Sequence, residues 1–246
     1  MQKKSKQYIA KKTLTKQHSF LKRTWHIFKR IFLWFFILQF VYILLCKWIN
    51  PPITLTQISS ILHGDGLHRD YVSIDEMSPE IKLAVMAGED QLFPDHDGFN
   101  LKAIKLAIKY NKKHPDRPRG ASTISQQVAK NVFLWQGRSF IRKGLEAYFT
   151  FMIEKIWGKK RILEMYLNVA EMGEGIFGVQ AAAKTDFNKE AKDLTKAEAA
   201  MIASCLPNPK AYTIKPMSNY IAKRYPEIMH QMSNLEGDPD IQELMK

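Results

Sequence analysis

The stretch that decides the fold is Ser78 to Asn100, SPEIKLAVMAGEDQLFPDHDGFN. Ser78 can cap a helix, and Pro79 suits the first helical turn. The residues from there to Gly88 are almost all apolar and leave no wet face around a helix. The pattern therefore predicts a buried helix over residues 78–88.

Two carboxylates, Glu89 and Asp90, stand where this helix must end, because Pro94 prevents its continuation. A carboxylate at a buried helix end is costly unless it is paired or used. Two interpretations follow from this stretch, a solvated pair at a helix end and a catalytic carboxylate. On its own the stretch does not favour either one.

The charge of the chain is concentrated at its N-terminus. The 246 residues carry a formal net charge of +13, but residues 1–30 hold ten Lys and Arg and no acidic residue. The remaining residues have a net charge of only +3. Because the excess belongs to a basic tail, we expect no nucleic-acid partner for the rest of the chain.

An apolar segment, Ile31 to Ile49, follows the basic tail and holds one charge, Lys47, near its end. At ~1.5 Å per residue it would span roughly 28 Å as a helix, about the thickness of a bilayer core. Asn50-Pro51-Pro52 follows it instead of a small-residue cleavage site, which favours an anchor over a signal peptide. The tail predicts a cytoplasmic N-terminus, with residues 50–246 on the outer face of the membrane.

The rest of the chain reads as mainly α. Residues 50–77 are expected to form a connector with short strands at Ile53–Ile58 and Tyr71–Ile74, and residues 236–246 a frayed tail. A domain over residues 78–235 lies between them. Beyond the first helix, we expect helices over residues 100–113, 122–135, 139–154, 159–172, 178–187, 195–206 and 218–235.

Three further patterns have a plain interpretation. His63 to His68 brackets two glycines, which indicates a turn rather than a metal site. Residues 173–178 match GxGxxG but follow a helix, so we interpret them as a turn and not as a dinucleotide site. In the helix over 100–113, Leu101, Ile104 and Ile108 share a face opposite four lysines. Those lysines fit a solvated face or a surface resting on anionic lipid.

Polar residues recur at helical spacing on one face of the helix over residues 122–135. Thr123, Gln126, Gln127 and Lys130 form this stripe, and Asn131 extends it. A polar stripe is usually only a wet face. Here, however, neutral amide donors and one cation stand together, a combination suited to sugar and phosphate.

Cations gather at the start of the helix over residues 139–154. Arg138, Arg142 and Lys143 lie there, and Arg142 can pair with Glu146 at the i, i+4 spacing. Cations near a helix N-terminus oppose the helix dipole. Their placement therefore suggests an anionic ligand nearby.

Five segments, taken in order, resemble the glycosyltransferase family 51 domain of bacterial cell-wall synthesis. They read EDQLFPDHDGFN, GASTISQQVAKN, RKGLEAYFTFMIE, KKRILEMYLNVAEMGEGIFGVQAAA and AEAAMIASCLPNP, and together span about residues 85–210. The resemblance implies a lysozyme-like helical glycosyltransferase domain behind a single transmembrane helix. The likeness is to monofunctional members of the family. The one Ser-x-x-Lys, Ser19 to Lys22, lies in the basic tail, so we expect no transpeptidase activity.

The resemblance also implies a reaction, the polymerisation of lipid II into β-1,4-linked glycan with release of polyprenyl pyrophosphate. It makes Glu89 the general base of an inverting mechanism and Glu146 the second catalytic carboxylate. The other site residues would bind pyrophosphate or sugar: Ser122, Thr123, Gln126, Gln127, Lys130, Asn131, Arg138, Arg142 and Lys143.

The expected partners are lipid II, the growing strand, the bacterial cytoplasmic membrane and other cell-wall synthesis proteins. No cofactor is required by the sequence, although a divalent cation, Mg or Mn, could accompany the pyrophosphate. Two alternatives stay open at this point. One is a lysozyme-like lytic transglycosylase, and the other is an inactive scaffold tethered to the membrane.

Overall fold

The computed structural model describes residues 2–117, 119–137 and 139–245, with side chains from residue 22 onward. The chain forms two compact units, Met1–Trp48 and Ile49–Lys246. The first unit consists of one helix, α1 (Gln2–Cys46). Its part Lys22–Cys46 is long and apolar enough to cross a membrane, as expected for an anchor. The helix stops at Cys46 rather than at Ile49, ahead of two prolines that disfavour a helix.

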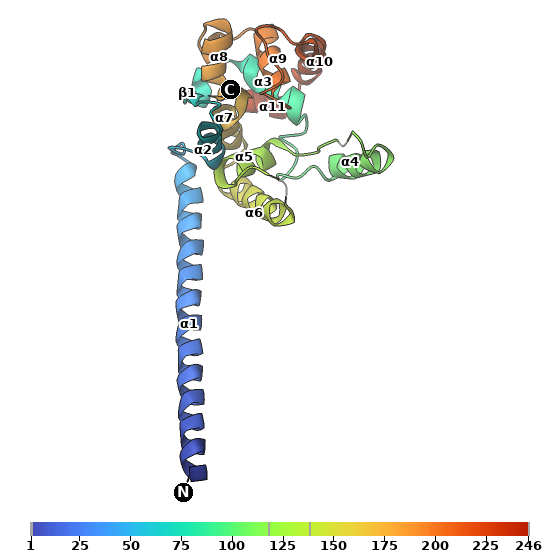
Figure 1. Ribbon diagram of the computed structural model, residues 1–246. Coiled ribbons are helices and arrows are strands. Elements are labelled where there is room, and N and C mark those ends of the chain that lie inside the picture. The colour runs from blue at the N-terminus through green and yellow to red at the C-terminus, as the bar shows by residue number, and fades with distance from the viewer. Residues whose placement is uncertain (1, 118, 138, 246) are drawn as a thin grey trace. The chain divides into compact units, whose positions relative to one another are not determined.

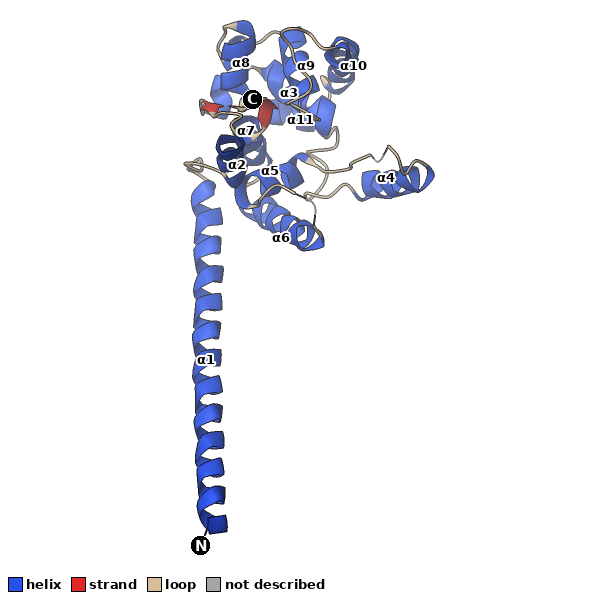
Figure 2. Ribbon diagram, in the orientation of Figure 1, coloured by secondary structure: helices blue, strands red, loops and turns tan. Residues whose placement is uncertain are grey.

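The second unit is mainly α, as predicted, with three very short strands (Figure 2). Its helices are α2 (Leu55–His63), α3 (Pro79–Glu89), α4 (Leu101–Lys113), α5 (Ile124–Phe133), α6 (Phe140–Ile156), α7 (Lys159–Val169), α8 (Val179–Phe187), α9 (Lys196–Cys205), α10 (Asn219–Leu235) and α11 (Pro239–Met245). Single 3-10 turns occupy Ile74–Glu76 and Ala191–Asp193.

The strands form one small sheet in the order β1-β3-β2, made of His68–Arg69, Ile176–Phe177 and Glu171–Gly173 respectively. β1 and β3 are parallel, with His68 opposite Ile176, and β2 and β3 are antiparallel. A Cβ atom at Gly178 would lie 2.6 Å from the carbonyl oxygen of Asn168. The glycines of the GxGxxG match therefore serve a tight chain reversal, as the sequence indicated.

The predicted buried helix, α3, lies at the centre of the unit. Ser78 caps it by accepting a hydrogen bond from the N–H of Ile81, and residues 81–87 are all buried. It packs against α9, α10 and α11, while a second group is built on α5, which packs against α2, α6 and α7 (Figure 1). The end of α3 and the start of α5 bring these two groups together.

The strands expected in the connector at Ile53–Ile58 and Tyr71–Ile74 do not form, so that prediction was wrong. Thr54 and Gln57 form a capping box that starts α2, and Gly64 ends the helix in the left-handed conformation at φ 84°. The alternation of β-branched and polar residues over 53–58 suggested a strand. The cap and the packing of α2 on α5 outweigh that local preference.

The prediction of a frayed tail after Glu236 was also wrong. α11 buries Ile241 and Leu244 and packs on α3. Lys82, a lysine in the buried face of α3, donates a hydrogen bond of 3.0 Å to the carbonyl oxygen of Met245. The lysine thereby satisfies the end of α11, which explains a charge inside an otherwise apolar helix.

α4 has the amphipathic pattern expected of it but buries none of its residues. It lies apart from the other helices of its unit (Figure 1). Leu101 and Ile108 are more than half exposed on its surface. An apolar helical face that is left in solvent is typical of a surface that contacts lipid, a substrate or a partner.

Candidate active site

Glu89 is the last residue of α3 and is half-buried. Its Oε2 atom accepts a hydrogen bond of 2.6 Å from Nε2 of Gln127, whose Oε1 atom accepts one of 3.2 Å from the Tyr166 hydroxyl. Burial raises the pKa of Glu89, while the Gln127 hydrogen bond and the charge of Arg224 act in the opposite direction. The carboxylate is therefore oriented by a neutral amide and is more basic than an exposed glutamate.

Asp90, the neighbouring carboxylate, is buried, and both of its oxygens lie within hydrogen-bond distance of His96. Its Oδ2 atom accepts a hydrogen bond of 3.1 Å from the N–H of Ile124 in the first turn of α5, and the same atom lies 3.0 Å from Nε2 of His96. A carboxylate at a helix N-terminus stabilises that helix. Asp90 thus joins the end of α3 to the start of α5, whereas Glu89 faces the neutral amide of Gln127.

Glu146, on α6, is buried and held by two cations. Arg142 Nη1 lies 2.9 Å from its Oε2 atom, as the i, i+4 spacing predicted, and Lys143 Nζ contacts its Oε1 atom. Nε of Arg142 is buried and has no hydrogen-bond partner within the described residues. An orphaned donor next to fixed cations indicates a place for an anion.

Lys130, on α5, links the two carboxylates electrostatically. Burial lowers its pKa, and the negative charges of Glu146 and Glu89 oppose that shift. The side chain therefore lies within the field of both carboxylates. Of the predicted residues, Gln127, Lys130 and Asn131 on α5 line the cavities around Glu89 and Lys130, whereas Arg142, Lys143 and Glu146 on α6 are not in the described lining of either cavity.

Two cavities meet at this site and share Gln127 and Pro207 in their walls. The Glu89 cavity has a volume of about 710 Å³ and is also lined by Ser122 and Thr123. The Lys130 cavity has a volume of about 420 Å³ and includes Asn131. Both volumes lie in the range of small-molecule sites.

Two of the predicted binding residues are engaged in holding the fold. Oγ1 of Thr123 donates to the carbonyl oxygen of Gly98 over 2.7 Å, and Thr123 and Gln126 form the capping box of α5. Gln126 is buried, and it does not belong to the described lining of either cavity. Its amide oxygen accepts from the N–H of Thr123 over 3.1 Å. Arg138, another predicted residue, lies outside the described residues.

The sequence reasoning missed two further walls of the site. α2 contributes Thr56, Ser59, Ser60 and His63 to the Lys130 cavity, and α10 contributes Arg224 and Gln231 to the Glu89 cavity. Oε1 of Gln231 is buried without a hydrogen-bond partner in the described part of the chain. A signal was present for α2, whose four residues share the i, i+3, i+4, i+7 spacing of one helical face.

The carboxylates of the site do not form a metal centre by themselves. Among the described residues, no three His, Cys, Asp or Glu side chains lie together in a way that could hold an ion. Both carboxylate oxygens of Glu146 are engaged by cations. These residues therefore do not fit a metal ion held by the protein alone.

Comparison with known proteins agrees with this geometry. Residues 55–233 match the family model described as transglycosylase. The chain is 51% identical over 190 residues to biosynthetic peptidoglycan transglycosylases of Escherichia coli and of Shigella boydii, covering 76% of this chain and 78% of each relative. The chain therefore belongs to the transglycosylase family.

Proposed function

We propose that the protein is a peptidoglycan glycosyltransferase that polymerises lipid II into β-1,4-linked glycan strands and releases polyprenyl pyrophosphate. One observation carries the proposal. Glu89, desolvated and oriented by Gln127, lies within the electrostatic reach of Lys130, whose own surroundings include Glu146 and Arg142. The names of the similar proteins, biosynthetic peptidoglycan transglycosylases, support the same activity.

Glu89 acts as the general base in this proposal. It takes the proton from the 4-hydroxyl of the acceptor sugar, and that oxygen attacks the anomeric carbon of the lipid-linked chain. The bond from this carbon to the pyrophosphate oxygen breaks, and the configuration inverts from α to β. A carboxylate whose pKa is raised by burial suits this step, because it is a stronger base than an exposed glutamate.

The cations stabilise the leaving group. Lys130 and Arg142 face the negative charge that builds on the pyrophosphate, and Lys143 adds a partly exposed charge. Glu146 holds Arg142 and Lys143 in place, so that the cations need not reorganise when the bond breaks. A divalent cation, where one takes part, arrives with the pyrophosphate.

The two cavities divide the substrates between them. The acceptor lies in the Glu89 cavity, where its 4-hydroxyl reaches the base, and the growing strand lies in the Lys130 cavity, where its pyrophosphate reaches Lys130. The reaction takes place where the cavities meet, beside Gln127. This arrangement holds the two reacting sugars in line.

The proposal also includes a membrane anchor and the side of the membrane on which the domain lies. The segment Lys22–Cys46 anchors the chain in the bacterial cytoplasmic membrane with a cytoplasmic N-terminus, since the tail before residue 31 is strongly basic. Residues 50–246 then lie on the outer face, where they meet a lipid-linked substrate. The exposed apolar face of α4 is suited to contact the lipid part of that substrate or the bilayer.

The two alternatives fit the site less well. A lytic transglycosylase expels no pyrophosphate and has no need of the cation cluster around Glu146. An inactive scaffold has no need of a half-buried carboxylate with a raised pKa in a cavity.

One assay separates these functions. The purified full-length chain is incubated with labelled lipid II and, in parallel, with finished peptidoglycan, and the products are resolved by gel. We expect long lipid-linked glycan from lipid II. Fragments released from finished peptidoglycan would favour the lytic enzyme, and an absence of products from either substrate would favour the scaffold.

A further inference from the structure

We propose that helix α2 forms one wall of the binding site for the growing glycan strand and that it sets how long the strand becomes. This inference rests on the proposed function. It assigns a role to a helix outside α3, α5 and α6, which carry the base and the cations, and it names the neutral sugars of the strand as the ligand of that helix.

The side chains of α2 that line the Lys130 cavity all carry hydrogen-bonding groups. Thr56, Ser59, Ser60 and His63 are spaced so that they share one face of the helix. α2 is held there by its packing on α5 and by a hydrogen bond of 2.7 Å from Nε2 of Gln136 to Oγ1 of Thr56. The polar face of α2 is therefore fixed in the cavity that Lys130 and Asn131 of α5 also line.

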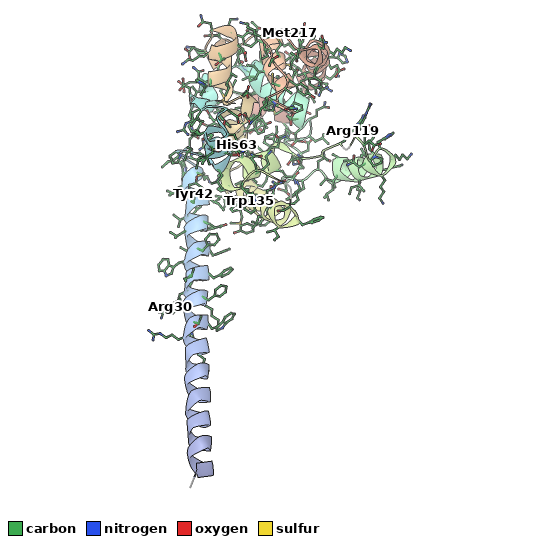
Figure 3. All side chains as sticks on the ribbon, viewed as in Figure 1. Arg30, Tyr42, His63, Arg119, Trp135 and Met217 are labelled. Atoms are coloured by element: carbon green, nitrogen blue, oxygen red, sulfur yellow. The ribbon has the colours of Figure 1, made fainter. Side chains whose placement is uncertain are left out.

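Ser60 and His63 show which groups of this face are engaged. The hydroxyl of Ser60 donates to the carbonyl oxygen of Gly66 over 2.8 Å, which fixes the chain after the helix. Nδ1 of His63 lies 2.7 Å from the carbonyl oxygen of Ser59, so Nδ1 is the donor in the neutral ring and Nε2 is left as an acceptor (Figure 3 labels His63). The Ser59 hydroxyl lies 3.3 Å from that same Nδ1, which leaves its donor capacity for a ligand.

The lining of the cavity also has an apolar part. Leu206, Pro207 and Pro209 contribute it, so the cavity offers both hydrogen-bonding and apolar surface. A pyranose ring has the matching character, with hydroxyl and acetamido groups at its edge and C–H groups on its faces. The walls therefore fit a sugar better than a lipid chain, which has no polar edge.

The charges of the cavity also favour a neutral ligand at the α2 end. Lys210 is paired with Asp65, which cancels both charges. Glu171 is half-buried and accepts a hydrogen bond of 3.2 Å from the N–H of Gly175, and burial raises its pKa. Within the part of the lining that the structure describes, Lys130 on α5 is a lysine for which no salt bridge is seen. The pyrophosphate end of the strand belongs at Lys130, and its sugars belong beside α2.

With the pyrophosphate placed at Lys130, the sugars farther along the strand are the ones that this proposal places beside α2. α2 therefore matters more for elongation than for the first coupling of two lipid II molecules. A strand that is held more weakly at this wall dissociates sooner, and its final length is shorter.

The test compares two variants of the full-length chain. The first is a double variant that combines Ser59→Ala and His63→Ala. The second is Ser59→Phe, whose larger side chain fills the cavity. Ser59 is half-buried and His63 exposed, so these changes spare the core. The control is Leu62→Ala, because Leu62 is 79% exposed on the same helix and does not line the cavity. Rates are measured with lipid II alone and with a lipid-linked tetrasaccharide as the donor, and strand lengths are measured on gels.

We expect the double variant to raise KM for the lipid-linked tetrasaccharide by roughly ten-fold, the effect of losing two ordinary hydrogen bonds. Its kcat should change less than its KM, and the first coupling should be affected less than elongation. Strands should be shorter in both the double variant and Ser59→Phe, and unchanged in Leu62→Ala.

Wild-type KM values and strand lengths in both α2 variants would overturn this inference while leaving the proposed function intact. Equal losses in the first coupling and in elongation would also overturn it. If the wild-type chain makes no glycan at all, the proposed function fails, and this inference fails with it.

Discussion

The end of α3 and the first turns of α6 each carry a glutamate that we assign to the proposed site, but the two stand in opposite surroundings. Glu89 accepts from one neutral amide, and burial makes it more basic. Glu146 is more deeply buried, yet both of its oxygens contact cations. The difference teaches that the partners of a carboxylate, and not its burial alone, decide whether it can take a proton or holds charged neighbours in place.

The largest expected effect comes from removing the base. Glu89→Gln keeps the shape of the side chain and can still accept the hydrogen bond from Gln127, so we expect an intact fold. Loss of the base should lower the rate of lipid II polymerisation by roughly 10²- to 10⁴-fold. Circular dichroism and a gel-based polymerisation assay measure the two properties. Near-normal polymerisation by this variant would remove Glu89 from the chemistry.

Glu146→Ala should act on stability as well as on rate, which sharpens the contrast with Glu89→Gln. The change leaves Arg142, whose side chain is only 11% exposed, without its carboxylate. Breaking a buried ion pair in this way lowers the free energy of unfolding by about 3 kcal/mol. Urea unfolding followed by circular dichroism checks the value. A variant as stable as the wild-type chain would show that Glu146 does not hold the cations.

Asp90→Asn tests the neighbour of the base. Asp90 serves His96 and the N–H of Ile124, so its loss should lower the free energy of unfolding by about 1–2 kcal/mol through two weakened hydrogen bonds. Polymerisation should fall less than in Glu89→Gln. The same two assays apply, and a loss of activity equal to that of Glu89→Gln in a stable protein would contradict this division of roles.

The elements of the site that lie on capped, periodic helices were predictable from the sequence. Ser78 and Ser139 each cap a helix at the predicted place, because capping and apolar spacing are local properties. The pairing of Arg142 with Glu146 was predictable for the same reason, since it lies within one helical turn.

The remaining parts depend on contacts between distant residues. Asp90 accepts a hydrogen bond from the N–H of Ile124 at the start of α5, a contact that its own segment does not specify. α2 was mistaken for a strand because the helix is selected by its packing on α5. The place of Arg224 beside Glu89 depends on the return of α10 to α3, which no local pattern indicates.

A smaller effect concerns stability and pH. Burial raises the pKa of Glu89 above its value in the unfolded chain, so the folded state holds this proton more tightly. The contribution of Glu89 to stability is therefore highest below the unfolded pKa, and it is lost as pH rises through the folded pKa. Glu89→Gln should raise the melting temperature, and by more at pH 8 than at pH 4. Thermal unfolding at the two pH values checks this, and a lower melting temperature at pH 8 would reverse the assignment of a desolvated carboxylate.

The most direct test of the account is the pH dependence of kcat/KM for the first coupling of lipid II. Glu89 must be ionised to act as a base, so the rate should fall on the acidic side with a midpoint above the ordinary glutamate value of 4.5. In Gln127→Met the hydrogen bond that favours ionisation is lost, and the midpoint should move to higher pH. A midpoint near 4.5 that does not move in Gln127→Met would contradict Glu89 as the desolvated general base.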